Sequence, residues 1–515
     1  MKFISLLKRG ANLIKVGHAV RSLKKATDED KHRWAKNYLI EILGQSRGLP
    51  AKVGQFMTLG KEDREFKGTL DSALAPMPFD QVVSILEEKY QTPINAIFSR
   101  LDEECRPASL GQVHFGTLAN GDKVAVKVQY PEIAESVEAE MDLMGFLPKV
   151  GPVVKWGFSM DGYRDAFWTN FKKELDYRQE LEHQQKYGEL AAPLKNVIIP
   201  GVYPELCHPT ILVQSLEEGI GLEKAETLRP NQRQSMGRAL LEHYFHMLFR
   251  HGFVHADPHP GNFAFRQTGK ESFSLIVYDY GCILQVPDEV RLGLLRIVLA
   301  LRSHEPLDPV ACLGMIGFYP EKLQDLRPTL PALLHTLFEP FLIEAPYDIK
   351  DWRMSERFDR IVGEMKWWFR SAAPPGLIFL MRTLHGLSVM LERLDVKISW
   401  RFIQDRLCSD LYPEAMAVTI PDVPSADGKV LHLDGIAQYL RVNVVKPNGN
   451  KVRLTMPARV ADNLEDVIDP PVKESIDRQN IDLAAIQKRV RETGFIPQKL
   501  FDLRDSEREV LVWLE

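Results

Sequence analysis

The sequence predicts an α+β protein of more than one domain. At 515 residues the chain exceeds what one hydrophobic core usually spans. Helical periodicity, a run of strands and a long helical region follow one another, and a polar, proline-rich stretch at residues 420–428 precedes a last segment of mixed pattern. With 45% hydrophobic and 26% charged residues, the composition is that of a globular protein and not of a disordered chain.

The N-terminal segment, residues 1–27, contains seven Lys or Arg and no Asp or Glu. Its apolar residues recur at helical spacing, which predicts a basic amphipathic helix. Three roles stay open for this helix: packing on the protein body, reversible contact with an anionic membrane surface, and a mitochondrial presequence. Residues 28–104 continue as a helical extension.

Strands are expected from Cys105 onward, where two β-rich runs flank an Asn120-Gly121 turn that is typical of a hairpin. Helical patterns follow, interrupted by a short strand pair after Val197. Beyond the linker, alternating apolar residues predict another hairpin and a final strand at the C-terminus. The predicted domains after the extension are 105–196 with strands, 197–419 dominated by helices, the linker 420–428, and a small α+β domain at 429–515.

The bulk composition excludes several classes of protein. A formal net charge of -5 gives no basic footprint for nucleic acid. The five cysteines form no CxxC pair, which argues against a zinc site or a disulfide framework and fits a reducing compartment. No run reaches the roughly 18 consecutive apolar residues of a spanning helix, and no secretory signal is evident. We expect a cytoplasmic protein, peripheral at the inner face of a membrane at most, with the mitochondrial matrix as the alternative.

The most informative stretch is VHADPHPGNFAF, residues 254–265. Pro258 and Pro260 each remove a backbone donor and fix φ, so this stretch is a stiff loop and not a helix interior. The loop holds Asp257 and Asn262 five positions apart, and apolar residues close both of its ends. It therefore presents a carboxylate and an amide in a fixed relation.

A second carboxylate and a lysine complete the set. The apolar run at 275–281 delivers Asp279 in the sequence Asp-Tyr-Gly, and Lys127 stands in the strand sequence VAVK. Phosphoryl transfer requires oxygen ligands that hold Mg²⁺ between nucleotide phosphates and a group that orients the nucleophile. A lysine in a VAVK strand contacts nucleotide phosphates in kinases. The order VAVK, Asp-x4-Asn, Asp-Tyr-Gly thus predicts a nucleotide and Mg²⁺ site for phosphoryl transfer.

Simpler interpretations of single residues stay open. Asp257 and Asn262 could merely cap backbone groups of a turn, and His255 and His259 could either bind a metal or brace the loop. Arg382, inside an apolar helical run, is expected to pair with an internal carboxylate.

Six motifs in order make the sequence resemble the UbiB/AarF family of atypical kinases, the aarF-domain kinases linked to coenzyme Q biosynthesis. The resemblance covers residues 45 to 410 and implies a bilobal protein-kinase-like fold with a helical N-terminal extension. The motifs are KVGQ at 52–55, PASLGQVH at 107–114, VAVK, ELD at 174–176, HADPHPGN and DYG.

The resemblance also implies roles for the motif residues. Lys127 would pair with Glu174 and contact the phosphates of ATP, while Asn262 and Asp279 would bind Mg²⁺ and Asp257 would occupy the position of a catalytic base. The loop that replaces a glycine-rich nucleotide loop would bind the cofactor through Ala108, Ser109, Gly111 and Gln112. A regulatory lid would comprise Lys52, Gln55 and, on the facing side, Asp176.

Departures from the family pattern shape the expected function. Only Gly111 remains of a glycine loop, no APE-like segment follows Asp279, and the small C-terminal domain stands where relatives often carry membrane spans. We expect an ATP- and Mg²⁺-dependent kinase or ATPase that acts on water or on a small or lipid-like acceptor, in isoprenoid quinone or lipid metabolism. The alternatives are a true protein kinase, and a nucleotide-gated scaffold that binds a lipid or a protein partner, the latter through the C-terminal domain.

Overall fold

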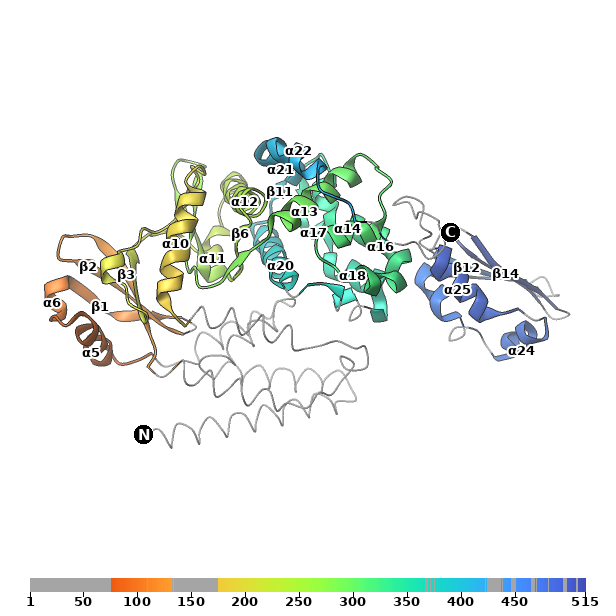
Figure 1. Ribbon diagram of the computed structural model, residues 1–515, viewed down its shortest axis with the longest axis horizontal. Helices are drawn as coiled ribbons and strands as arrows, with labels where there is room; N and C mark the ends of the chain where they lie inside the picture. Colours follow the sequence, from red (N-terminus) through yellow and green to blue (C-terminus); the bar gives the residue numbers. More distant parts are fainter. Residues whose placement is uncertain are drawn as a thin grey trace, which may run out of the picture.

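The computed structural model describes residues 76–515 with gaps, so the predicted basic helix and most of the helical extension lie outside the described residues. The gaps are at 109, 132, 134–174, 366–368, 371, 375, 422, 424–436, 438, 446–450, 465–467, 469, 480, 494–497 and 506–507. In Figure 1 a four-stranded sheet forms one end of the molecule, helices form the middle, and a second four-stranded sheet with its own helices forms the other end.

The first sheet is antiparallel and has the strand order β1-β2-β3-β5. Its strands are β1 (Phe98–Pro107), β2 (Gly111–Leu118), β3 (Lys123–Gln129) and β5 (Ile211–Ser215), and helices α5 (Phe79–Tyr90) and α6 (Ile94–Ile97) precede them. Side chains alternate between the two faces of each strand. Val124, Val126 and Val128 pack on one face in a core shared with α5, which leaves Lys127 on the other face.

This sheet extends beyond both boundaries that the sequence suggested. Strand β1 begins at Phe98 and not at Cys105, and β5 joins β3 from beyond residue 196. The prediction missed β1 because its charged and exposed residues, typical of an edge strand, show no apolar alternation. Helix α10 (Tyr177–Ala191) follows the sheet strands β1 to β3 and precedes the short strand β4 (Val197–Ile198).

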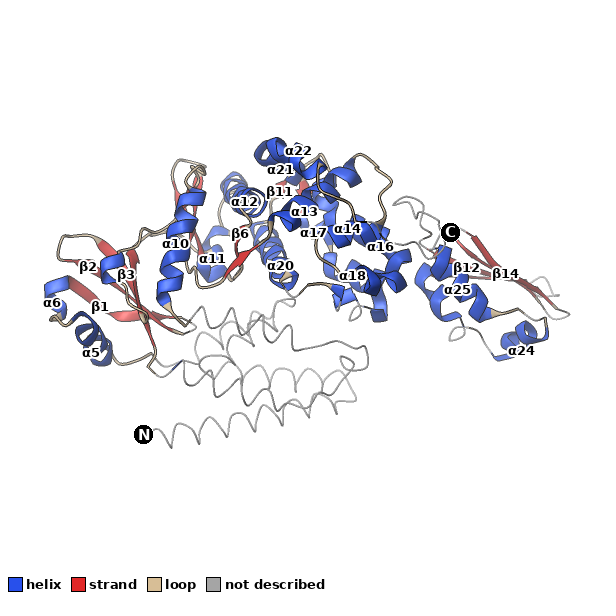
Figure 2. Cartoon of the chain, viewed as in Figure 1, coloured by secondary structure: helices blue, strands red, loops and turns tan. Residues whose placement is uncertain are grey.

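The middle of the molecule is mainly helical, with short strands that carry the predicted loop and the Asp-Tyr-Gly segment (Figure 2). The short strands are β6 (Phe253–His255), β7 (Phe263–Gln267), β8 (Phe273–Val277), β9 (Ile283–Gln285), β10 (Tyr347–Asp348) and β11 (Lys397–Ile398). The α-helices are α11 (Leu222–Ala225), α12 (Pro230–Phe245), α13 (Asp288–Arg302), α14 (Pro309–Met315), α15 (Pro320–Leu323), α16 (Leu330–Leu342), α17 (Ile349–Trp352), α18 (Met354–Val362), α20 (Leu377–Leu394), α21 (Trp400–Cys408) and α22 (Tyr412–Met416). Short 3₁₀ segments are η1 (Pro204–Leu206), η3 (Pro260–Asn262), η4 (Gln324–Thr329), η5 (Gly363–Met365) and η6 (Ser409–Leu411), and η2 (His246–Arg250) is a π-helical turn.

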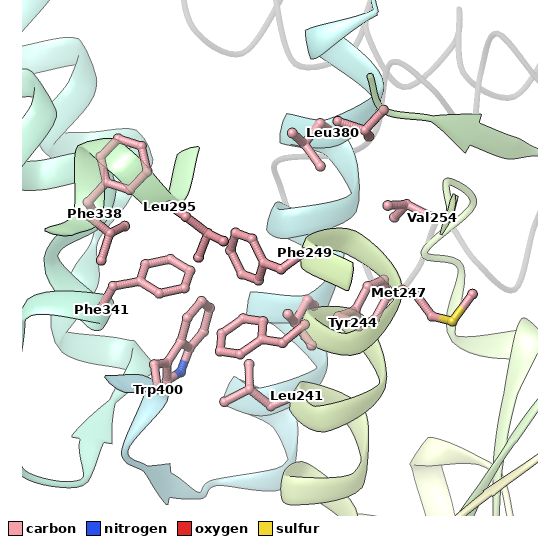
Figure 3. Close-up of a cluster of buried hydrophobic side chains, with 14 of the residues drawn as sticks. Leu241, Tyr244, Met247, Phe249, Val254, Leu295, Phe338, Phe341, Leu380 and Trp400 are labelled. Atoms are coloured by element: carbon pink, nitrogen blue, oxygen red, sulfur yellow. The ribbon is translucent and has the colours of Figure 1, made fainter. Parts of the chain in front are cut away.

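One large apolar core holds these helices together. In Figure 3 the rings of Phe249, Phe341 and Trp400 gather between the helices, and Phe341 meets Trp400 edge-on with ring centroids 5.2 Å apart. Val254, one residue before His255, is fully buried in the same core. The core therefore anchors the start of the loop that carries Asp257.

The C-terminal unit is a sheet of order β13-β12-β15-β14 with its own core. Its elements are β12 (Tyr439–Val445), β13 (Lys451–Pro457), η7 (Ala458–Asn463), α24 (Pro470–Arg478), α25 (Leu483–Thr493), β14 (Gln498–Arg504) and β15 (Glu509–Leu514). The predicted hairpin is present as β12 and β13, and the predicted last strand is present as β15. Helix α25 contacts η4 of the helical region.

Two further sequence expectations concern the described part of the chain. None of its helices combines the length and the apolar composition needed to span a bilayer. All five cysteines lie within it, and all five are free thiols.

Buried histidines near the loop predict a loss of stability in acid. Burial lowers the pKa of His243 to about 3, with His255 and His246 adding to the effect, and the pKa of His251 is lowered to about 4 for the same main reason. Below the ordinary pKa of 6.5 the unfolded chain takes up protons that the folded chain cannot, so stability is fully present above pH 6.5 and falls as the pH falls toward these values.

We expect the free energy of unfolding, measured by urea titration, to fall by about 1 kcal/mol between pH 7.5 and pH 5.5 because of the fully buried His243, with a smaller part from the half-buried His251. Tyr187 is hydrogen-bonded to His243 at 2.7 Å, and a glutamine can take over that bond. His243→Gln should therefore fold and lose less stability in acid than the unmodified chain. Parallel pH profiles for the two proteins would contradict this origin of acid sensitivity.

Candidate active site

Lys127 lies at the centre of the candidate site. Its Nζ is 2.8 Å from Oε2 and 2.9 Å from Oε1 of Glu180 on α10, and 3.2 Å from Oδ2 of Asp279. The ammonium also lies 4.9 Å from the centre of the Tyr177 ring. Lys127, Glu180 and Asp279 are far apart in sequence, and the fold brings their charged groups into one cluster, in which Glu180 is buried and Asp279 is partly exposed.

Among the described residues, the glutamate that pairs with Lys127 is Glu180, and the expected pairing with Glu174 stays a prediction. Glu174 lies outside the described residues. Glu180 is one turn into α10 and its side chain is almost fully buried, so it reaches Lys127 across the face of β3. The resemblance assigned this role to Glu174 of the ELD motif and not to Glu180, because the sequence does not show the direction of α10 relative to β3.

Burial and charge act together on this cluster. Burial alone would lower the pKa of Lys127, but the carboxylates of Asp279 and Glu180 reverse that effect and hold it well above its ordinary value. Burial also raises the pKa of Glu180, against the opposing effect of the Lys127 charge. Lys127 is therefore a charged ammonium at neutral pH, positioned by two carboxylates.

We expect Glu180→Gln to weaken binding of Mg-nucleotide by about tenfold, because a hydrogen bond between charged groups that positions Lys127 is replaced by a weaker one. Isothermal titration calorimetry measures the effect. Glu182→Gln, an exposed change on the same helix, is the matched control. A larger loss in Glu174→Gln than in Glu180→Gln would restore the pairing that the sequence suggested.

Asp279 is held in an unusual backbone conformation. Its φ is +57°, in the left-handed region that few residues other than Gly, Asn and Asp adopt. Its Oδ1 accepts a hydrogen bond from the Gly281 amide at 3.1 Å, and its carbonyl lies 2.6 Å from Nε2 of the buried His255. These contacts fix the direction of the carboxylate toward Lys127.

The two histidines of the loop have structural roles. The His255 ring bonds the backbone of the Asp-Tyr-Gly segment, and Nδ1 of His259 accepts from the Gly261 amide at 3.2 Å. Across the described residues, no group of three or more His, Cys, Asp or Glu side chains is arranged to hold a metal. The expectation that both histidines brace the loop is confirmed.

Asp257 and Asn262 are joined across the loop, as their spacing predicts. Asn262 Nδ2 donates to the Asp257 carbonyl at 3.2 Å and to its Oδ2 at 3.0 Å. Because both acceptors are oxygens, the amide orientation is determined, and Oδ1 of Asn262 is turned away from Asp257. An amide oxygen and the Asp279 carboxylate are the oxygen ligands that Mg²⁺ prefers, so these residues fit the metal.

Helix α20 packs against the loop that carries Asp257. Nη2 of Arg382 donates to Oδ1 of Asp257 at 2.9 Å, and both side chains are nearly buried. One turn later, a Cβ at Gly386 would lie 2.2 Å from Cβ of Pro258, so only glycine lets the loop lie this close to the helix. The expected partner of Arg382, an internal carboxylate, is Asp257 itself.

The predicted nucleotide loop is a tight turn between β1 and β2. The Ala108 amide donates to the Gly111 carbonyl at 2.9 Å, and a Cβ at Gly111 would lie 2.2 Å from the Val128 oxygen, so the glycine serves close strand packing. Ser109 lies outside the described residues. Gln112 is fully buried and its amide bonds both backbone polar groups of Met77. The prediction that Gln112 binds the cofactor is corrected for its side chain, because strand alternation turns it away from the face of Lys127.

Of the predicted lid only Asp176 is described, because Lys52 and Gln55 lie outside the described residues. Asp176 caps α10: its Oδ1 accepts from the Arg178 amide at 3.0 Å, and Oδ2 lies 2.8 Å from Nη2 of the same arginine. These contacts, with the Arg178 side-chain bond as the main cause, lower the pKa of Asp176. The arrangement in which Lys52 and Gln55 face Asp176 across the site stays a prediction.

A comparison with known protein families finds a match over the part of the chain that holds these site residues. Residues 69–306 match the ABC1 atypical kinase-like domain. The chain carries an ABC1 atypical kinase-like domain of the UbiB/AarF family. The resemblance that the motifs suggested is thereby confirmed, and the kinase-like domain includes Lys127, Glu180, Asp257, Asn262 and Asp279.

Curated relatives carry names of the same family. The chain is 29% identical over 297 residues to AarF domain-containing protein kinase 1 of Xenopus tropicalis, covering 55% of this chain and 57% of that protein. It is 26% identical over 375 residues to atypical kinase COQ8B, mitochondrial, of Rattus norvegicus, covering 70% of each. The chain spans little more than half the length of the AarF domain-containing kinases it matches.

Among solved structures, the chain resembles Rv3197 of Mycobacterium tuberculosis, solved as a complex with erythromycin. The TM-score is 0.52 at 22% identity, over 73% of this chain and 96% of that one. This similarity shows the fold, and together with the family match it establishes a kinase-like α+β fold.

Proposed function

We propose that this protein is an ATP- and Mg²⁺-dependent atypical kinase or ATPase with a bilobal kinase-like architecture. The observation that carries the proposal is the meeting of Lys127, Glu180 and Asp279, from β3, α10 and the Asp-Tyr-Gly segment, at 2.8 and 3.2 Å. A lysine held between two carboxylates is positioned to receive nucleotide phosphates when a divalent cation draws one carboxylate away.

Each residue of the site has a separate proposed role in phosphoryl transfer. Lys127 would bind the nucleotide phosphates, Glu180 would hold Lys127 in place, and Asn262 and Asp279 would hold Mg²⁺, which neutralises charge on the phosphates. Asp257 would orient the attacking hydroxyl or water and accept its proton. His255 keeps the Asp279 backbone in register with the loop.

A nucleotide-gated scaffold is the second candidate, and one contact favours it. Arg382 donates to Oδ1 of Asp257, and an aspartate paired with an arginine is a weaker proton acceptor. As a scaffold, the protein would bind the nucleotide without useful turnover. A lipid or protein partner would bind at another place on the chain, such as the C-terminal unit.

For the acceptor and the cellular setting, the names of the relatives are the only support. Relatives named COQ8B, mitochondrial, and ACTIVITY OF BC1 COMPLEX KINASE 8, chloroplastic, support a role in isoprenoid quinone or lipid metabolism. We propose a lipid-like acceptor at a membrane surface, approached with the help of the basic residues within 1–27.

Release of inorganic phosphate from Mg-ATP tests the proposal, with and without anionic liposomes. We expect turnover by the unmodified chain that rises with liposomes and is lost in Asp257→Asn, while the variant is still folded at the assay temperature and unfolds in one cooperative transition. Nucleotide binding without any turnover would favour the scaffold, and absence of both would contradict the proposal.

A further inference from the structure

The sheet of the C-terminal unit has two edge strands, β14 and β13, and β14 is protected against pairing with another chain. Its apolar residues Leu500, Phe501 and Leu503 are all buried, and its exposed side chains are charged. The pairing of β14 with β15 also shifts in register between Lys499 and Phe501. Charged side chains and a bulge are the features by which proteins keep an edge strand from pairing with a further strand.

Strand β13, at the opposite edge, lacks this protection. Residues 451–455 are all exposed, and the apolar Val452 and Leu454 among them expose 43% and 49% of their surface. The pairing of β13 with β12 is regular from end to end, with no bulge. Beyond that pairing, residues 451–456 make no backbone hydrogen bond to another described residue. A long, regular edge strand with exposed apolar residues is ready to pair with another strand.

The exposed residues of β13 continue the apolar layer of the unit. Val452 pairs with Val444 and Leu454 pairs with Val442, and paired residues of antiparallel strands lie on the same face. Val442 and Val444 pack against the core that the sheet shares with α24 and α25. The apolar layer therefore reaches the edge of the sheet, where Val452 and Leu454 stand open to solvent. A strand added beside β13 would continue this layer.

The sequence of β13 fits a second copy of the same strand. In an antiparallel pair with its two-fold axis at Leu454, all seven residues of β13 are paired. Leu454 then lies opposite Leu454 of the second copy, Val452 opposite Met456, and Arg453 opposite Thr455. Apolar residues meet apolar residues on the core face, and no two like charges lie directly opposite each other, which would destabilise the sheet.

Other registers fit less well. An axis at Arg453 would place two arginines directly opposite each other, and an axis at Thr455 would pair only part of the strand. An axis between two residues would bring the apolar face of one copy onto the charged face of the other. The register about Leu454 is therefore the one that the residues of β13 favour.

We propose that β13 is an interaction surface for a second copy of this chain, which pairs with it antiparallel about Leu454 and joins the two C-terminal sheets into one. In Figure 1 the C-terminal sheet lies at the opposite end of the molecule from β3, the strand of Lys127, so pairing leaves the candidate active site of each copy accessible. The proposal does not depend on the activity of that site. A pairing through one short strand gives a weak dimer that forms as the concentration rises.

Oxidative cross-linking of the full chain carrying Leu454→Cys tests the register. Opposite residues of antiparallel strands have Cα atoms roughly 4.5–5.5 Å apart, which a disulfide can bridge. Val452→Cys is the matched control, because it is equally exposed on the same face but lies about 13 Å from its equivalent in this register. The unmodified chain, whose five cysteines are free thiols, gives the background.

We expect Leu454→Cys to give at least about fivefold more covalent dimer on non-reducing gels than Val452→Cys or the unmodified chain. Equal yields from the two cysteine variants would overturn the proposed register, because chance encounters would then explain both.

Sedimentation velocity of the full chain between about 1 and 100 µM tests the association itself. The unmodified chain should form dimer as its concentration rises, and Leu454→Lys should remain monomeric, because it places two ammonium groups opposite each other at the axis. Met416→Lys, the same kind of change at an exposed residue of α22, is the control and should still dimerise. A monomeric unmodified chain over the whole range, or a dimer that persists in folded Leu454→Lys, would overturn the proposal.

Discussion

Asp279→Asn is expected to abolish binding of Mg-nucleotide while leaving the fold intact. The substitution removes the negative charge that Mg²⁺ requires and that Lys127 contacts at 3.2 Å. Asparagine is the best replacement for this test, because the backbone φ of +57° is tolerated by asparagine and strained for most other residues. A loss of binding can then be assigned to the carboxylate and not to the backbone.

Calorimetric titration with a non-hydrolysable ATP analogue and Mg²⁺ measures this effect. Asp80→Asn, an exposed change of the same charge on α5, is the matched control and should bind normally. The assignment of Asp279 as a metal ligand would be contradicted if Asp279→Asn bound the nucleotide with an affinity within about threefold of that of the unmodified chain.

Arg382→Met is expected to lower the free energy of unfolding by about 3 kcal/mol, because it removes the counter-charge of a nearly buried carboxylate. Arg382 and Asp257 are 2.9 Å apart with side-chain exposures of 11% and 13%, and burial on this scale makes the loss larger than that of a surface pair. The same change leaves the apolar part of the side chain in place.

Urea denaturation of Arg382→Met, Asp257→Asn and the double variant measures the coupling between the two residues. We expect the double variant to be destabilised by less than the sum of the single changes. Arg401→Met is the control, because it breaks a more exposed pair with Glu344 and should cost less than about 1 kcal/mol. Equal losses in Arg382→Met and Arg401→Met would show that the loop does not depend on α20.

The sequence predicts well the residues whose relation is set over a short distance along the chain. Asp257 and Asn262 share one stiff loop, so their spacing alone placed them together, and the structure joins them at 3.0 Å. Asp279 was predictable for a related reason, since β8 leads into the Asp-Tyr-Gly segment and pairs with β7, which follows the loop.

Partners that depend on how elements pack could not be assigned from sequence. Glu180 and Arg382 lie 53 and 125 positions from the residues they bond. The motif resemblance pointed to Glu174, six positions before Glu180, and not to Glu180 itself. The arginine in an apolar helix did indicate a buried carboxylate, but its identity depends on the approach of α20 to the loop, which Gly386 makes possible.

The most direct test of the central claim is a crystal structure of the chain with Mg²⁺ and a non-hydrolysable ATP analogue. We predict phosphates at Lys127 and a metal ion about 2.1 Å from oxygens of Asn262 and Asp279. A nucleotide bound elsewhere, or a metal ion held by neither residue, would contradict the account.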